Sequence, residues 1–413
     1  MALTDFKPQF DNAYEDIFNK VLVGKAIANL RFEPLLRYGQ KVTRVLLNLD
    51  SVAVRETSRG SASTIDSVTD STEDLEIDQE FEAAFHISDG EVTQAGPMNP
   101  GEVIGRNIGE KVAANLDYRI LKQTINAEND FDNGNLTTVD ASTVPITMSS
   151  TTVPQMVTRL PAILRVKNPQ TLTNICFVCD PIVASDLAQY LLGKQFDIVN
   201  YIWRNGYSEE EFARAEVYIS DQLCGEATLQ VRGTEGIHSF YNGSYINING
   251  VTFKFTTSLA AAGDVCIATG TTVNVTVANA WQWLSAALNK PYTSNACYYA
   301  HAATSAAVLG ENLYSLSLTN GVSDAIIRGP GRLTLVESGS TASFSSPHLH
   351  CYYGKKGAID VVVQDIKSVD MRQCADRRGT NVFASYLAGI KTFTDGKKKF
   401  LDVLVFTGDA TAA

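Results

Sequence analysis

Residues 41–58 and 75–92 both alternate between apolar and polar side chains, as a β-strand with one covered face does. The second stretch places its large apolar residues at odd positions, namely Leu75, Ile77, Phe81, Phe85 and Ile87. Residues 60–73, between the two stretches, are polar and rich in turn formers. The pattern predicts a hairpin of roughly 15 to 18 residues a side, about 50 to 60 Å long. Because a lone hairpin is marginal in water, we expect it to lie on a neighbouring molecule rather than to be buried by its own chain.

A long helix is predicted over residues 99–126. Asn99 supplies an N-cap, Pro100 suits the first turn and Glu102 completes a capping box. Apolar residues then recur every four positions, at Ile104, Ile108, Val112, Leu116 and Ile120. The pattern indicates an amphipathic spine about 36 Å long.

The rest of the chain mixes helices and strands, which predicts an α+β fold. Residues 1–40 have no long periodic face and are expected to form an arm that covers a partner's surface. Residues 150–235 are predicted to contain a helix at 153–166 with a break near Pro161, a buried strand at 173–179, a helix that Asp180 caps and a strand at 216–220.

A change in composition sets residues 236–340 apart. Thr, Gly, Ala and Asn dominate there, with short strands at 245–249, 251–256 and 313–318, so we predict an inserted domain. Trp281 and Trp283 in this stretch suit core packing, with glycan stacking as the alternative. The earlier style returns afterwards, with apolar strands predicted at 358–363, 382–390 and 400–406.

Composition and charge narrow the functional classes. Of the 413 residues, 45% are hydrophobic and 19% charged, which excludes wholesale disorder, collagen-like repeats and coiled coil. A net charge of −11 makes the chain a poor general binder of nucleic acid, because phosphates require clustered cations. Seven scattered cysteines suit a reducing compartment. Since neither a secretory signal nor a membrane-crossing apolar run occurs, we expect a cytoplasmic protein without membrane contact.

Most of the net charge falls on the predicted hairpin, where twelve acidic residues face only two arginines between positions 50 and 91. A solvated face is the ordinary explanation, and the acids do not follow the EF-hand spacing of a calcium site. We expect this arm to lie across basic segments of an adjacent subunit, where a row of pairs orients the docking although each exposed pair contributes little. The candidate contacts are Asp66, Asp70, Glu73, Asp74 and Glu76 on one side and Lys355, Lys356, Arg377, Arg378, Lys397, Lys398 and Lys399 on the other.

Candidate metal ligands and catalytic residues are few. Cys176 and Cys179 have the spacing of half a zinc site, but they lie in an apolar strand and are expected to be small buried hydrophobes. His348 and His350 would share one face of a strand and could bind a metal. Without an acid or cysteine at suggestive spacing, a solvated strand end is the expected explanation. No nucleophile elbow, phosphate loop, dinucleotide fingerprint or zinc-protease motif occurs, so we predict no catalytic site, no cofactor and no metal.

The ordered set of arm, hairpin, spine helix and α/β segment resembles the major capsid proteins of tailed bacteriophages, which have the Hong Kong 97 type of fold. The resemblance extends over most of the chain and is carried by the stretches LEIDQEFEAAFHISDGEVTQ, FVCDPIVASDLAQYLL and ADRRGTNVFASYLAGIKTFTDGKKKFLDVLVF. It implies an N-terminal arm at 1–40, an extended E-loop at 41–97, a P-domain with the spine helix at 98–145, an A-domain at 146–235, an inserted surface domain at 236–340, a return of the A-domain at 341–372 and C-terminal P-domain strands at 373–413. Residues 248–288 also resemble small modules inserted in phage structural proteins.

The resemblance implies a non-enzymatic protein that self-assembles into hexamers and pentamers of an icosahedral head around double-stranded DNA. The implied location is the virion capsid, assembled in the cytoplasm of a host bacterium. The implied partners are further copies of the chain, portal and scaffolding proteins, a decoration protein as a further candidate, and packaged DNA through non-specific contact. Two alternatives remain open, namely an encapsulin-like compartment shell and a carbohydrate-binding adhesin module.

The same resemblance bears on covalent cross-linking and on scaffolding. Some relatives join their subunits through a lysine of the E-loop, but this chain has no Lys between Lys41 and Lys111. We therefore expect no isopeptide cross-links between subunits. Because the chain starts directly at the arm, we also expect no fused scaffolding segment.

Overall fold

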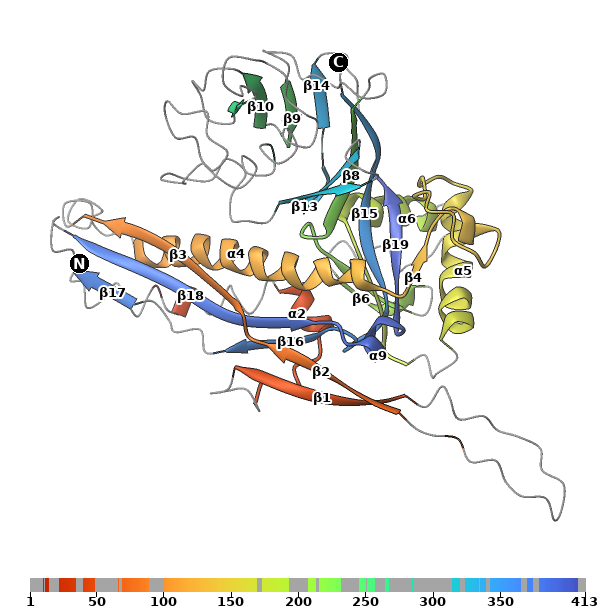
Figure 1. Cartoon of the computed structure of the whole chain (residues 1–413), viewed down its shortest axis with the longest axis horizontal. Coiled ribbons are helices and arrows are strands. Elements are labelled where there is room, and N and C mark those ends of the chain that lie inside the picture. Colours follow the sequence, from red (N-terminus) through yellow and green to blue (C-terminus); the bar gives the residue numbers. More distant parts are fainter. Residues whose placement is uncertain are drawn as a thin grey trace. The chain divides into compact units, whose positions relative to one another are not determined.

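The computed structural model describes residues 10, 12–14, 22–34, 40–48, 66, 69–88, 100–168, 173–192, 207–212, 215–231, 245–249, 251–256, 264–266, 284, 314–319, 324–333, 335–338, 342–364, 370–373 and 379–407. The chain divides into two compact units. Unit 1 comprises Met1–Leu116 and Lys356–Lys399, and unit 2 comprises Asp117–Lys355 and Phe400–Ala413. Both units combine helices with sheets (Figure 1), so the predicted α+β class is confirmed.

Unit 1 contains a four-stranded antiparallel sheet built around one long strand. This strand is β18 (Thr380–Lys391), which pairs with β16 (Asp360–Gln364) and β17 (Asp370–Gln373). Along most of its length it also pairs with β3 (Gln79–Ile87), from Thr380 opposite Ile87 to Ala388 opposite Gln79. The predicted strands at 358–363 and 382–390 are therefore confirmed as β16 and β18, within a few residues at their ends.

A separate two-stranded sheet, the β1–β2 ribbon, is also part of unit 1. It joins β1 (Lys41–Asn48) to β2 (Thr69–Glu76) in antiparallel register, with Lys41 opposite Glu76 and Asn48 opposite Thr69. The predicted hairpin thus exists, but residues 75–92 do not form one continuous arm of it. The chain leaves the ribbon at Glu76, and β3 pairs instead with β18. Residues 49–65, 67–68 and 89–92 lie outside the described residues, so the full length of the hairpin stays a prediction.

The link between β2 and β3 crosses β18 at Gly389. A Cβ atom added at this glycine would lie 2.6 Å from the backbone oxygen of Glu76, which is too close for any side chain. Next to the crossing, Leu75 is fully buried in a cluster with Phe32, Val362 and Phe393. The expectation that this chain cannot bury the hairpin is therefore wrong for its base, which has its own apolar anchor.

The N-terminal arm also packs on its own chain where the structure describes it. Phe10 and Tyr14 are buried, and the rings of Phe10 and Phe85 lie 5.9 Å apart. Farther along, α2 (Val23–Ile27) precedes a bridge in which the Asn29 amide donates to the Asp360 carboxylate at 2.6 Å. The prediction that the arm must borrow a partner's surface is wrong for these residues, because unit 1 supplies the covering surface itself.

The predicted spine is confirmed as α4 (Pro100–Leu121) followed directly by the 3-10 turn η1 (Lys122–Asn126). Val112 and Leu116 are buried as the apolar repeat predicts, whereas Ile104 and Ile108 are only half-buried. Gly105 explains this change of face, since a Cβ atom there would lie 2.8 Å from the backbone oxygen of Phe10. Close approach of the N-terminal segment, rather than a row of large side chains, covers the first half of the helix.

Unit 2 is built on a nine-stranded sheet in which a long strand, β15 (Ala342–Lys355), is central. The main strand order is β12-β13-β8-β15-β5-β7-β6, and β19 joins β15 to β4. The remaining bounds are β4 (Asn129–Phe131), β5 (Ile175–Cys179), β6 (Tyr207–Phe212), β7 (Ala215–Ile219), β8 (Cys224–Val231), β12 (Ser315–Thr319), β13 (Asp324–Pro330) and β19 (Phe400–Phe406). The predicted strands at 173–179, 216–220, 313–318 and 400–406 are confirmed as β5, β7, β12 and β19, with ends shifted by one or two residues.

The helices of unit 2 agree with the sequence except at one proline. The 3-10 turn η2 (Gly134–Leu136) precedes α5 (Thr152–Lys167), which continues through Pro161, so the predicted break is wrong. Burial of Val153, Met156, Leu160, Ile163 and Leu164 holds the helix across the missing hydrogen bond. The cap of α6 (Pro181–Leu192) is as predicted, because the Asp180 carboxylate accepts a hydrogen bond from the Ile182 amide at 2.9 Å.

A second sheet of unit 2 lies within the predicted insertion, residues 236–340. It has the order β11-β10-β9-β14, formed by β9 (Tyr245–Ile248), β10 (Val251–Thr256), β11 (Asp264–Cys266) and β14 (Leu335–Ser338). Two other strands of the same stretch, β12 and β13, belong to the nine-stranded sheet, because β13 pairs with β8. Trp281 and Trp283 lie outside the described residues. No helix in the described part of the chain is both long and apolar enough to cross a membrane.

Candidate functional site

The exposed face of the β1–β2 ribbon carries paired charges close to its base. The Lys41 ammonium lies 2.5 Å from the Asp74 carboxylate and 3.5 Å from that of Glu76. The Thr43 hydroxyl donates to Asp74 at 2.6 Å, and the hydrogen bonds from Lys41 and Thr43 lower the pKa of Asp74. Part of the acidic row that sequence assigns to a neighbour is thus already matched by β1 of the same ribbon.

The ribbon also contacts the turn formed by α9 (Thr394–Lys397) in the same unit. Arg44 donates two hydrogen bonds to the two Asp395 oxygens, at 3.0 and 2.7 Å. The Glu73 carboxylate accepts from the Thr394 amide at 3.1 Å and from its hydroxyl. Because bidentate arginine pairs are geometrically demanding, these contacts fix the direction of the base of the ribbon within unit 1.

The predicted basic partners are distributed differently from the acids. Lys399 pairs with Asp395 at 2.9 Å. Burial alone would raise the pKa of Asp395, but the hydrogen bonds from Lys399 and Arg44 outweigh burial and lower this pKa. Lys397 is half-buried and Lys398 exposed in the same turn. Lys355 ends β15 in unit 2, whereas Lys356 begins the return of the chain to unit 1.

The remaining candidates divide into exposed acids and residues outside the description. Asp70 and Glu76 on β2 are exposed, and Asp66 is half-buried. Arg377 and Arg378 lie outside the described residues. Pairing of these acids with a neighbour's basic residues therefore stays a prediction.

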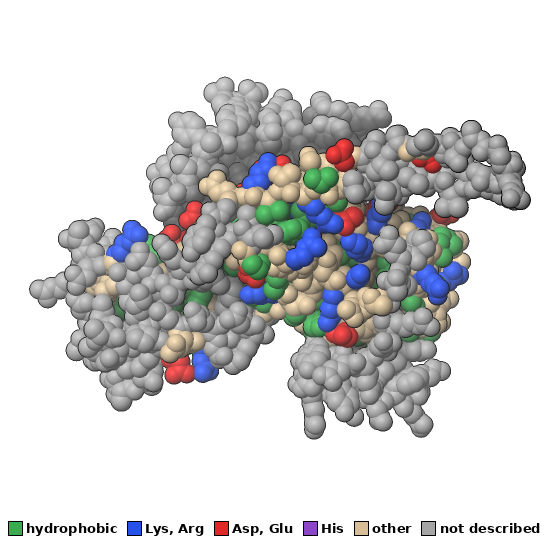
Figure 2. Space-filling model, turned by 90° about the horizontal axis from the view of Figure 1, so that it is seen from below, with side chains coloured by type: hydrophobic (Ala, Val, Ile, Leu, Met, Phe, Trp, Pro, Cys, Tyr) green, Lys and Arg blue, Asp and Glu red, His purple; other side chains and the backbone are tan. Residues whose placement is uncertain are grey.

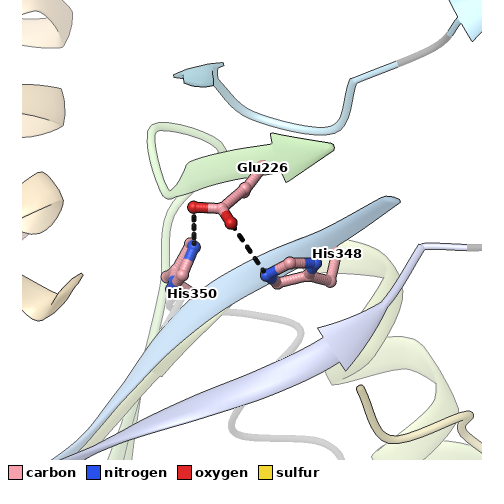
Figure 3. Close-up of side chains that lie close together, drawn as sticks. All are labelled: Glu226, His348 and His350. Atoms are coloured by element: carbon pink, nitrogen blue, oxygen red, sulfur yellow. Dashed lines mark hydrogen bonds and ion pairs between the residues drawn. The ribbon is translucent and has the colours of Figure 1, made fainter. Parts of the chain in front are cut away.

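The two histidines of β15 do not lie at a solvated strand end, so that prediction is wrong. The side chains of His348 and His350 are only 11% and 6% exposed, and both face Glu226 on the neighbouring strand β8 (Figure 3). Glu226 lies directly opposite His348 in the pairing of β8 with β15. The sequence interpretation missed this acid because it is 124 residues away from His350 along the chain.

These histidines belong to a row of charged groups that crosses five strands of the nine-stranded sheet. Register places Arg328 of β13 opposite Glu226, and Asp402 of β19 opposite Asp130 of β4. Arg328 Nε donates to Glu226 Oε2 at 2.6 Å, and His350 joins Glu226 to Asp402 with contacts of 3.3 and 2.6 Å. All members of the row project from the same face, since in-register residues of paired strands share a face.

Burial and neighbouring charges shift the pKa values within this row. Burial lowers the pKa of His350, but Asp402 and Glu226 outweigh it and hold that pKa well above its usual value. Burial raises the pKa of Glu226, whereas His350 and Arg328 bring it down to about 2. For Asp130, burial and then the charge of Asp402 raise the pKa to about 6. The row therefore holds more negative charge than Arg328 alone can balance.

The paired cysteines differ from the histidines. Cys176 and Cys179 are completely buried in β5, as the apolar strand predicts, and burial raises the pKa of the Cys179 thiol. A raised pKa keeps a thiol protonated, and protonated thiols are weak metal ligands and weak nucleophiles. Within the part of the chain that the structure describes, Glu226, His348 and His350 are the grouping whose ligand atoms lie close enough to share a metal ion.

No protein-family model matches this chain, and no curated protein matches it. Among solved structures, it is similar to one from Mycobacterium phage Che8, with 11% sequence identity and a TM-score of 0.47 over 93% of this chain and 90% of the other. It is also similar to the capsid structure of the cyanophage P-SCSP1u, with 9% identity and a TM-score of 0.43 over 95% and 89% of the two chains. A virus-like particle from Pyrococcus furiosus is similar too, with 9% identity and a TM-score of 0.41 over 97% and 99%. The solved structures that this chain is similar to thus include a phage capsid and a virus-like particle.

Proposed function

We propose that this chain is a major capsid protein that assembles into hexamers and pentamers of an icosahedral phage head. The observation that carries the proposal is the β1–β2 ribbon. Within the described residues, it forms a sheet of only two strands, in which Val45 is 57% exposed. A two-stranded sheet is marginal by itself and leaves unpaired edges, so a neighbouring subunit is the natural cover for its outer part.

The role is mechanical rather than catalytic. Repeated subunit contacts close a shell, and the closed symmetry converts many modest interfaces into a particle that resists pressure from inside. The base of the ribbon is fixed to its own unit by Leu75 and Arg44, which would present the outer part in one direction. A fixed direction reduces the conformational freedom that assembly has to remove.

Ionic contacts between neighbouring subunits would orient this docking. We propose that Asp66, Asp70, Glu73, Asp74 and Glu76 face Lys355, Lys356, Arg377, Arg378, Lys397, Lys398 and Lys399 of an adjacent copy. Asp70 and Glu76 are exposed and best placed for it. Such pairs specify register more than they add affinity, because water and salt screen them.

The enclosed polymer would be double-stranded DNA, held without sequence specificity. On the face that Figure 2 shows, the described Lys and Arg side chains are interspersed with acidic, apolar and other polar side chains. Scattered cations neutralise few phosphates, and with a net charge of −11 the contact would be weak. Portal, scaffolding and decoration proteins are the further partners that we propose for such a shell. Assembly would take place in the cytoplasm of a bacterial host.

Electron microscopy of the purified protein tests the proposal. We expect closed shells with six-fold and five-fold capsomers, and nuclease-protected DNA inside particles from infected cells. A monodisperse monomer at every protein concentration would overturn the proposal. Shells that enclose a protein cargo instead of DNA would identify an encapsulin-like compartment.

Charge reversal at Arg377 and Arg378 tests the ionic contacts separately. We expect the double variant R377E/R378E to give soluble, folded subunits that form few shells. The matched control is R165E/K167E, which changes the net charge equally at two exposed positions of α5. Normal shells from R377E/R378E would reject the pairing, while the shell itself would stand.

A further inference from the structure

Three possible metal ligands converge on one point of the nine-stranded sheet. His348 and His350 project from β15 toward the Glu226 carboxylate on β8 (Figure 3). His348 Nε2 lies 4.0 Å from Glu226 Oε1, and His350 Nε2 lies 3.3 Å from Glu226 Oε2. Ligands bound tetrahedrally at about 2.0 to 2.1 Å from a zinc ion are about 3.3 Å apart. The three ligand atoms lie within 4.8 Å of one another, so side-chain movements would bring them to this spacing.

The hydrogen bonding of His350 requires a positive charge at this point. Its Nδ1 lies 2.6 Å from the Asp402 carboxylate, which can only accept, so Nδ1 carries the proton. A neutral ring then directs the lone pair of Nε2 at the Glu226 oxygen 3.3 Å away, and two lone pairs at that distance repel. Either a second proton or a metal ion has to lie between them.

The charge balance of the row favours a divalent cation. Glu226, Asp402 and Asp130 lie in the same row as one arginine, Arg328, which leaves a surplus of negative charge. A proton on His350 would supply one positive charge to the row, whereas a divalent ion would supply two. A dication held by two neutral imidazoles and a carboxylate would neutralise more of the surplus.

We propose that Glu226, His348 and His350 bind a divalent transition-metal ion of the zinc class. The Glu226 carboxylate and the two Nε2 atoms would be the protein ligands, and water would take the fourth position on the side of His348, the more accessible of the two imidazoles. Two imidazoles and one carboxylate suit Zn²⁺ and disfavour Mg²⁺ and Ca²⁺, which prefer oxygen ligands.

Two further side chains would position these ligands without touching the metal. Asp402 holds the His350 ring through Nδ1, the arrangement that orients most metal-binding histidines. Arg328 donates to Glu226 Oε2 and so leaves Oε1 free to turn toward His348. Both partners are buried or half-buried, which keeps the carboxylate and the ring in place before the ion arrives.

The ion would connect β8 and β15 at a weak point of their pairing. The register of the two strands shifts between Ser345 and His348, and Glu226 is opposite His348, where regular pairing resumes. A metal ion at this position would join the two strands through three ligand bonds, next to the residues where their regular backbone pairing is interrupted. The inference concerns the stability of unit 2 and does not depend on the proposed role in a shell.

Calorimetric titration of the metal-stripped protein with zinc chloride tests the site. We expect one Zn²⁺ per chain, a dissociation constant in the micromolar range or below, and a rise of several degrees in the melting temperature at saturating Zn²⁺. In the variant H348Q, affinity should fall at least 100-fold. The control H86Q removes a histidine that is exposed in β3, and it should bind Zn²⁺ as the wild type does.

A spectroscopic measurement guards against variants that fail to fold. Co²⁺ also takes tetrahedral sites and absorbs visible light, so the metal-stripped wild type should gain a tetrahedral Co²⁺ spectrum that Zn²⁺ abolishes. Absence of that spectrum, or no Zn²⁺ binding by the folded wild type, would overturn the proposal and leave a doubly protonated His350 between its two carboxylates. Equal Zn²⁺ affinity of H348Q and the wild type would overturn it as well.

Discussion

The β1–β2 ribbon and the nine-stranded sheet both carry rows of opposite charges, but water reaches the two rows differently. In the ribbon, the side chains of Lys41 and Asp74 are 46% and 36% exposed. In the sheet, those of His350 and Asp402 are 6% and 3% exposed. Similar pairs of charges therefore have different consequences, because the effective dielectric constant around them differs several-fold.

The comparison teaches where each row acts. Exposed pairs contribute little to the stability of a subunit, but they remain available to orient a second surface. Buried pairs offer no outside surface, yet the loss of one partner leaves an uncompensated charge in the interior. The ribbon is accordingly suited to contacts between molecules, and the row in the sheet to holding its own strands together.

The largest expected effect is that of removing His350 from the buried row. The variant H350L leaves Asp402 and Glu226 without their shared cation, and breaking a buried pair in this way costs about 3 to 5 kcal/mol. Urea denaturation in the presence of a chelator measures the loss of unfolding free energy. The matched variant H86L changes an exposed histidine and should cost much less; equal losses would contradict the contrast between the two regions.

A smaller loss is expected at the apolar anchor of the ribbon. Leu75 is fully buried against Phe32, Val362 and Phe393, so L75A removes well-packed apolar contacts. It should lower the unfolding free energy by about 2 to 5 kcal/mol, and mainly destabilise unit 1, which contains the whole cluster. Hydrogen exchange of β1 and β2 would show whether the ribbon loosens first. V45A, at a position on the same ribbon that is 57% exposed, is the control and should fold as the wild type does.

A pH-dependent effect of about 1 kcal/mol is expected at Asp360. Burial raises the pKa of this carboxyl to about 6, although the hydrogen bond from Asn29 opposes the shift. Between the unfolded value of 3.8 and about 6, the folded chain keeps a proton that the unfolded chain has lost, so the unfolding free energy falls as the pH rises. D360N should gain stability over the wild type at pH 7 and lose that advantage near pH 4. A constant difference across this range would show that Asp360 does not titrate as inferred.

The smallest expected effect on the subunit is that of the exposed pair between Lys41 and Asp74. K41Q should leave the denaturation curve unchanged in ordinary salt, because water and ions screen the pair. Its effect should appear instead in the salt dependence of assembly, followed by light scattering. A marked loss of subunit stability would mean that the two rows are more alike than their exposure indicates.

Elements with local signals could be predicted from the sequence. The helix over residues 100–126 has a proline start, a capping acid and a four-residue repeat, and each is visible within one turn or two. The alternation of residues 75–92 is equally clear, but it does not reveal the change of partner after Glu76. Because Leu75, Ile77 and Phe81 stay in phase, the pattern is the same whether the residues pair with β1 or with β18.

Features that depend on residues far apart in the chain could not be predicted from the sequence. Glu226 meets the two histidines only through the register of β8 with β15. Gly105 buries one side of α4 through the backbone of Phe10, and a search for large apolar residues overlooks such a face. The anchor around Leu75 likewise assembles residues from four separate stretches of the chain. The acidic charge of the ribbon could be read from the sequence, whereas its intramolecular partners Lys41, Thr43 and Thr394 could not.

The crossing at Gly389 limits how this region can diverge among related proteins. The Glu76 carbonyl occupies the space where any other residue would place its Cβ atom, so no side chain can be accommodated while the strands keep their course. Homologues that retain the crossing should therefore keep glycine there even after their surface residues have been replaced, and a family alignment should reveal it as an invariant column.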